Sequence, residues 1–291
     1  MVWTKELACG QDRTVSALSE TPLSGGGSTA VNRRGDVVLR ERRPWSPAVM
    51  ALLTHLSEAG LVGAPVPIGT GFAEDGREQL RYIDGDPAPS CWSEDGAHAV
   101  GVLLRQVHTL SAQFPHKREW MPWWGRALPS RDVVIGHGDA APWNILARAG
   151  LPCALMDWDT AGPVGRQWDV AQTAWLNCQL HDDDVAALQG LPDADGRAQR
   201  LAAFCDGYEL APGDRSTLIP DMIDIALRTS AQEAIDAGVT PQGTRPSIVG
   251  LLGGGAPFSG HELLWAVTWR VRAARWMSEH RPLLEAALRA R

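Results

Sequence analysis

Two polar clusters in the chain hold side chains of the types that phosphoryl transfer requires. The first is H-G-D-A-A-P-W-N over residues 137–144, and the second is D-W-D over residues 157–159. Transfer from a nucleotide needs a carboxylate to orient the hydroxyl of the acceptor, and oxygen ligands for the Mg²⁺ that neutralises the phosphates. Asp139, Asn144 and Asp157 are of these types, so the sequence predicts a catalytic carboxylate and a metal site here.

Each cluster follows a short apolar run, over residues 133–135 and 154–156, and such runs are typical of buried strands. Asp157 comes thirteen residues after Asn144. An antiparallel hairpin between the clusters would bring the three side chains together.

The elements around these clusters divide the chain into two parts. Turn-forming residues over 84–89 mark the boundary. Before it we expect a hairpin with strands 31–33 and 37–41, then a helix over 47–59 that Ser46 caps and Pro47 begins. After it, apolar residues at helical spacing predict a mostly α-helical part.

The composition of the 291-residue chain indicates a folded protein, because 44% of the residues are hydrophobic and 21% are charged. The net charge of −7 argues against nucleic acid or an anionic membrane as a partner. We find no signal peptide, no apolar stretch that could span a bilayer and no paired cysteine spacing. These features predict a cytoplasmic protein.

The pattern H-G-D-x-x-P-x-N followed by hydrophobic-D-x-D resembles the aminoglycoside phosphotransferase and choline kinase group, which shares the protein-kinase fold. The resemblance extends over about residues 20–290 and includes W-D-V-A at 168–171. It implies a bilobal α+β fold. Residues 1–85 would form a small β-rich nucleotide-binding lobe, and residues 86–291 a larger, mostly helical lobe that carries the catalytic residues and the acceptor site.

The resemblance also implies roles for individual residues. Asp139 would be the catalytic base, and Asn144 and Asp157 would hold Mg²⁺. His137 would brace the catalytic loop, and Asp169 would hydrogen-bond its backbone.

The nucleotide, ATP or GTP, would contact the small lobe. Arg40 lies where the group has its phosphate-binding lysine, and the first helix offers no glutamate to pair with it, since Glu58 falls near the far end. A glycine-rich segment would approach the phosphates, although it lacks the full G-x-G-x-x-G spacing of kinases. Its residues are Ser24, Gly25, Gly26, Gly27 and Ser28.

The acceptor is predicted to be a small molecule with a hydroxyl group and positive charge. Residues 86–291 carry 24 acidic side chains against 18 basic ones, which favours a cationic ligand. The resemblance places the acceptor against this lobe and implies an aminoglycoside or related aminocyclitol antibiotic as the leading candidate. The candidate acidic residues are Asp182, Asp183, Asp184, Asp206, Glu209, Asp221, Asp224, Glu233 and Asp236.

Other functions remain open at this stage. The protein could be a kinase for choline, homoserine or a sugar, or a nucleotide-binding pseudokinase. A phosphoesterase that uses Asp157 and Asp159 is a further alternative. Pro246–Gly260 could form a lid or a plain connection between helices.

Several aromatic residues and one histidine have simpler explanations. We expect His108 to be a packed core residue. A core stripe is the expectation for Trp265, Trp269 and Trp276, whereas the tryptophans at 120, 123 and 124 could stack on an acceptor ring.

Overall fold

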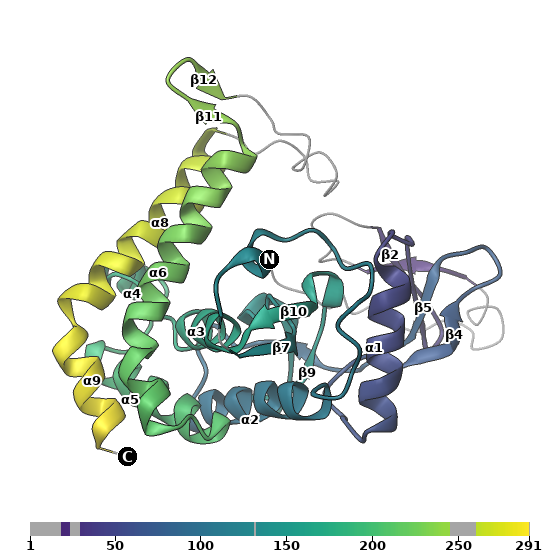
Figure 1. Ribbon diagram of the computed structural model, residues 1–291, viewed down its shortest axis with the longest axis horizontal. Coiled ribbons are helices and arrows are strands. Elements are labelled where there is room, and N and C mark those ends of the chain that lie inside the picture. The colour runs from purple at the N-terminus through teal and green to yellow at the C-terminus, as the bar shows by residue number, and fades with distance from the viewer. Residues whose placement is uncertain (1–18, 24–29, 131, 245–259, 291) are drawn as a thin grey trace, which may run out of the picture.

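The computed structural model describes residues 19–23, 30–130, 132–244 and 260–290, which form a small β-rich lobe and a larger helical lobe (Figure 1). The strands are β1 (Thr21–Pro22), β2 (Val31–Arg34), β3 (Val37–Arg40), β4 (Pro67–Phe72), β5 (Glu78–Arg81), β6 (Asp86–Pro87), β7 (Val133–Gly136), β8 (Ile145–Arg148), β9 (Leu151–Leu155), β10 (Gly162–Gly165), β11 (Val239–Thr240) and β12 (Gly243–Thr244). The α-helices are α1 (Ser46–Glu58), α2 (Glu94–Leu110), α3 (Arg166–Asn177), α4 (Asp183–Leu188), α5 (Ala194–Tyr208), α6 (Pro212–Asp236), α8 (Gly260–Glu279) and α9 (Arg281–Arg289). This architecture confirms the predicted bilobal α+β fold.

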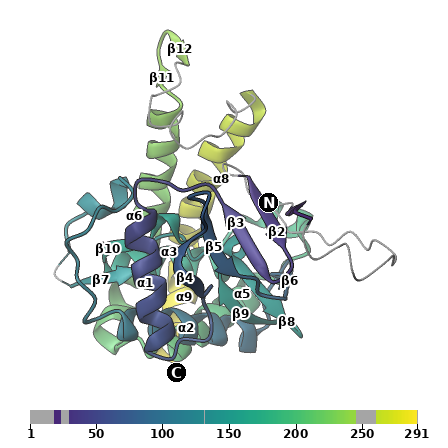
Figure 2. The ribbon, with the colours of Figure 1, turned by 90° about the vertical axis from the view of Figure 1, so that its right-hand side faces the viewer.

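The small lobe is one antiparallel sheet with the strand order β1-β2-β3-β5-β4, and α1 packs against it (Figure 2). The predicted hairpin is confirmed as β2 and β3. Its turn needs Gly35, whose φ of 62° lies in the left-handed region that glycine adopts without strain.

The prediction that Ser46 caps the first helix is wrong. The N-cap residue is Trp45, which makes no side-chain capping hydrogen bond, and Ser46 is the first helical residue. Its hydroxyl donates to Glu78 instead and accepts the backbone N–H of Arg43. Pro47 lies in the first turn as expected. The Ser46 hydroxyl therefore bonds to Glu78, on a strand distant in the sequence, instead of capping the helix.

The larger lobe is built around α2, α3 and α5, with the pair α6 and α8 projecting beyond the rest of the molecule (Figure 1). Val100, Leu104 and Val107 form the buried face of α2, as their helical spacing predicts. No helix in the described ranges is long and apolar enough to cross a membrane.

Two short β-structures in this lobe carry the polar clusters. β7 pairs with β10, and β8 lies between β6 and β9 in an antiparallel sheet. Asn144 precedes β8 and Asp157 follows its partner β9, so both lie at the same end of the hairpin. An antiparallel hairpin thus brings the clusters together as predicted, but its first strand, β8, was not among the predicted strands, and the run at 133–135 pairs with β10 instead. The division of the lobes at residue 85 stays a proposal.

Candidate active site

Asp139 lies in the loop that follows β7 and is held there by Asn144. The Asn144 amide donates to the Asp139 carboxylate at 2.8 Å and to its backbone carbonyl at 2.9 Å. A second amide, that of Gln172 on α3, reaches the other carboxylate oxygen at 3.4 Å. The carboxylate therefore has a fixed direction.

The surroundings of Asp139 raise the pKa of its carboxyl group to about 6. Burial is the main cause, and the negative charge of Asp157 adds to it. Hydrogen bonds from the side chains of Trp143 and Asn144 act in the opposite direction. A carboxylate with a pKa close to the working pH can both accept and return a proton, which suits general base catalysis.

Asp157 lies directly after β9 with φ of 56°, an unusual conformation for a residue other than glycine. Its side chain is 57% exposed and lies 3.6 Å from the Arg40 guanidinium. Partial loss of hydration raises the pKa of Asp157, and the charge of Asp159 acts in the same direction, while Arg40 opposes both. The structure thus brings together Asp139, Asn144 and Asp157.

Arg40, on β3, lies among three carboxylates. Its guanidinium contacts Asp159 at 2.6 Å and Asp157 at 3.6 Å on one side, and Glu78 of β5 at 3.1 Å on the other. Because the side chain is only 12% exposed, these ion pairs are screened weakly by solvent. Glu78 was not singled out from the sequence, since strand register is what places it opposite Arg40.

A buried network supports the loop that carries Asp139. Asp169, at the start of α3, accepts the backbone N–H groups of His137 and Gly138 at 3.1 and 3.0 Å. His108 of α2 donates to the same carboxylate at 2.8 Å, and its other ring nitrogen lies 2.7 Å from the Tyr208 hydroxyl. His108 is buried as expected, but it also positions Asp169, which its place on an apolar stripe did not indicate.

His137 itself has a structural role in this network. Its ring lies against Trp158, and Nε2 is 2.9 Å from the carbonyl oxygen of Met156, the residue before Asp157. Burial lowers the pKa of His137 to about 4. The neutral ring links the two polar clusters, in agreement with the bracing role that the resemblance implies.

The donor set fits a hard divalent cation such as Mg²⁺. Asp157 supplies a carboxylate and Asn144 an amide oxygen, and one oxygen of neighbouring Asp159 is buried without a hydrogen-bond partner. Within the described residues no group of three or more His, Cys, Asp or Glu side chains could hold a metal ion. Mg²⁺ is commonly held by one or two protein ligands together with phosphates and water, so this set is sufficient.

The other predicted nucleotide contacts are not placed at the site. Ser24, Gly25, Gly26, Gly27 and Ser28 lie outside the described residues, as does most of Pro246–Gly260. Their roles stay predictions.

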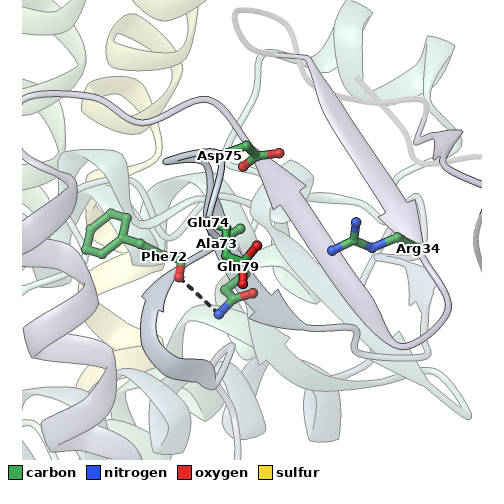
Figure 3. Close-up of a pocket in the computed structure, with 6 residues that line it drawn as sticks. All are labelled: Arg34, Phe72, Ala73, Glu74, Asp75 and Gln79. Carbon is green, nitrogen blue, oxygen red and sulfur yellow. Dashed lines mark hydrogen bonds between the residues drawn. The ribbon is translucent and has the colours of Figure 1, made fainter.

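An open pocket of about 480 Å³ lies on the small lobe, and its lining does not include Asp139, Asn144 or Asp157 (Figure 3). Gln79 lines this pocket and is the residue after Glu78 on β5. Because successive side chains of a strand point to opposite faces of the sheet, Gln79 and Glu78 point to different faces. The side chains of Arg34 and Gln79 in this pocket are therefore on the face of the sheet that Arg40 and Glu78 do not occupy. Its lining residues are Arg34, Phe72, Ala73, Glu74, Asp75 and Gln79.

Most acidic side chains that were candidates for a cationic acceptor are paired with arginine. Arginine pairing removes much of the negative charge that such a ligand would experience. The pairs are Asp182 and Asp184 with Arg272, Asp183 with Arg197, Asp206 with Arg215, Glu209 with Arg105, Asp224 with Arg228 and Glu233 with Arg270.

The tryptophan predictions are confirmed in part. Trp276 is buried and Trp269 stacks on Trp175 with ring centroids 5.2 Å apart, but Trp265 is exposed, so the core stripe is wrong there. The tryptophans at 120, 123 and 124 pack partly buried against the core.

The arrangement of the elements defines a protein-kinase-like fold, and comparison with solved structures of kinases and phosphotransferases shows the same fold. A choline/ethanolamine kinase family protein from Mesorhizobium loti has a TM-score of 0.57 at 18% identity, covering 96% of this chain and 95% of that one. For a choline kinase from Cryptosporidium parvum the TM-score is 0.59 at 10% identity, with 96% and 94% covered. A macrolide 2′-phosphotransferase from Brachybacterium faecium has a TM-score of 0.51 at 16% identity, covering 81% of this chain and 90% of that one. The predicted resemblance is confirmed as a shared fold.

Sequence comparison identifies the family. The trifolitoxin immunity protein of Rhizobium leguminosarum bv. trifolii is 43% identical over 272 residues, which are 92% of this chain and 98% of that protein. The chain belongs to the family of this immunity protein. No family model matches it.

Proposed function

We propose that the protein is a Mg²⁺-dependent kinase that transfers the γ-phosphoryl group of ATP or GTP to a hydroxyl group of a small molecule. One observation carries this proposal: the Asn144 amide orients the Asp139 carboxylate, and Asn144 lies with Asp157 at the same end of the β8–β9 hairpin. A carboxylate base placed next to side chains that can hold Mg²⁺ is the arrangement that phosphoryl transfer needs.

In this mechanism Asp139 accepts a hydrogen bond from the acceptor hydroxyl and receives its proton. The acceptor oxygen forms a bond to the γ-phosphorus as the bond to the bridging oxygen breaks, and the nucleoside diphosphate leaves. Arg40 offsets negative charge on the phosphate oxygens. Mg²⁺, held by Asp157 and Asn144, would neutralise charge on the nucleotide phosphates.

For the acceptor we propose a toxin or antibiotic that carries a hydroxyl group. The supporting observation is the 43% identity, over nearly the whole of both chains, to a protein whose name assigns it immunity to trifolitoxin. Trifolitoxin is therefore the first acceptor to test, and aminoglycosides and aminocyclitols follow. The arginine pairing of the acidic side chains weakens the charge argument for a polycationic acceptor, but it leaves the hydroxyl requirement unchanged.

The test is Mg²⁺-dependent consumption of ATP or GTP in the presence of each acceptor, with mass spectrometry of the acceptor to detect an added phosphoryl group. The panel also contains choline, homoserine and simple sugars. We expect one acceptor to stimulate turnover, and Asp139→Ala to abolish that stimulation while nucleotide binding and the melting temperature are retained.

Asp195→Ala is the matched control, because Asp195 is exposed in the first turn of α5 and should leave turnover unchanged. Normal turnover by Asp139→Ala would refute the mechanism. Nucleotide binding without turnover on any acceptor would instead favour the pseudokinase, and phosphate release from esters without nucleotide would favour the phosphoesterase.

A further inference from the structure

Glu78 is a buried carboxylate whose position is set by strand register. It lies opposite Arg40 in the antiparallel pair of β5 and β3, so both side chains point to the same face of the sheet. The Glu78 side chain is 1% exposed, and one of its oxygens lies 3.1 Å from Nε of Arg40. This contact is a charge pair rather than an aligned hydrogen bond, since neither atom has a hydrogen-bond partner.

The second Glu78 oxygen accepts a hydrogen bond from the Ser46 hydroxyl at the start of α1. Ser46 is fully buried. Helix α1 therefore contributes a hydroxyl rather than a carboxylate to this part of the site. Its one glutamate, Glu58, is exposed at the opposite end of the helix.

The two sides of the Arg40 guanidinium are thus held differently. Glu78 binds at Nε, whereas Nη1 and Nη2 face Asp157 and Asp159. A buried charge is costly without a partner, and an arginine without Glu78 would be drawn further toward the aspartates. It would then compete with a cation for Asp157.

We propose that Glu78 of β5 is the positioning residue for Arg40, and that it replaces the glutamate that the first helix lacks. The inference rests on the proposed function, because the position matters through the phosphates that Arg40 would contact. Burial raises the pKa of Glu78 against the opposing effect of Arg40. The charge of Arg40 thus favours the ionised form of Glu78, while burial opposes it.

The experiment compares wild type with Glu78→Gln, which keeps the shape and the acceptor atom for Ser46 but removes the charge. With the acceptor found above, we expect kcat to fall on the order of 100-fold, the loss typical of a misplaced group in an active site. We also expect the Mg²⁺ concentration for half-maximal rate to rise. Glu58→Gln is the matched control and should behave as wild type.

A double-mutant cycle distinguishes positioning from a general structural role. If Glu78 acts through Arg40, then Glu78→Gln should cause no further loss of kcat in an Arg40→Gln background. Two independent losses that multiply would overturn the inference, as would wild-type kinetics and Mg²⁺ dependence for Glu78→Gln.

Ser46→Ala keeps the test decisive if Glu78→Gln is too unstable. This change removes the hydrogen bond to the second Glu78 oxygen and also the one that Ser46 accepts from the Arg43 N–H. The part of its effect that acts through Glu78 should lower kcat when Arg40 is present but not in the Arg40→Gln background. Equal losses in both backgrounds would refute the positioning role. A wild-type protein that binds no Mg²⁺-nucleotide would overturn the proposed function as well, whereas an active wild type with an unimpaired Glu78→Gln overturns this inference alone.

Discussion

Asp169→Asn should destabilise the whole protein, because Asp169 is the buried acceptor on which the loop that carries Asp139 depends. One of its oxygens accepts the Gly138 N–H, and the other accepts the N–H of His137 and Nε2–H of His108. An asparagine has one acceptor oxygen. Its amide group therefore places a donor against at least one of three buried donors.

The magnitude follows from these contacts. A hydrogen bond to a charged group contributes about 1.5–3 kcal/mol, and a buried donor without a partner costs about 1–3 kcal/mol. We expect the free energy of unfolding to fall by about 3–5 kcal/mol. At roughly 2 °C per kcal/mol for a chain of this size, the melting temperature should fall by about 6–10 °C.

The assay is thermal unfolding followed by circular dichroism, with Asp132→Asn as the control. Asp132 pairs with Arg166 at the surface, and its loss should cost at most about 1 kcal/mol. A melting temperature of Asp169→Asn within 2 °C of wild type, on the order of 1 kcal/mol, would refute the reasoning.

The same variant makes a prediction about pH. Burial acts to raise the pKa of Asp169, but the hydrogen bonds from His108 and from the backbone N–H of Gly138 act against it, and the pKa is lowered. The stability that this carboxylate confers is therefore present above the ordinary aspartate pKa of about 3.9 and is lost as the pH falls through its folded-state value. The difference between wild type and Asp169→Asn should shrink on acidification below pH about 4.

The remaining predictions concern Asp139 and the loop glycine beside it. Because the pKa of Asp139 is raised to about 6 and the ionised form is the base, kcat/KM should rise up to that pH and then level off. Trp143→Phe removes a hydrogen bond that lowers this pKa, so a pH-rate profile should show the acid limb moved to higher pH; an unmoved limb would contradict the assignment. Gly138→Ala should lower the melting temperature strongly, since its φ is 79° and a Cβ would lie 2.7 Å from the Thr160 carbonyl oxygen. Gly76→Ala has a similar φ of 84° and open space, so equal losses in the two variants would exclude the contact as the cause.

Much of the site could be predicted because it is encoded over short distances. The order Asp139, Asn144 and Asp157 lies within one loop and one hairpin, where strand pairing alone brings both ends together. The first helix and the β2–β3 hairpin could also be predicted, because residues close together in the sequence specify them. Fold class followed from these local elements and from the resemblance that the motifs carry.

Other parts of the site depend on partners far away in the chain. The apolar stripe around His108 predicts a core histidine, but the structure shows that its ring also hydrogen-bonds to Asp169, 61 residues later in the chain. The acidic side chains of the larger lobe suggest a cation site when they are counted, but arginines from other helices neutralise most of them.

The sequence by itself therefore determined the loop that carries Asp139, the hairpin that follows it and the two-part architecture, since local spacing and turn chemistry specify them. Only the tertiary structure decided how Arg40 is held. Glu78 lies 38 residues after Arg40, and Ser46 had a satisfactory local role as a helix cap. Strand register and burial bring these groups together, because a carboxylate and a guanidinium removed from water must find partners within the fold.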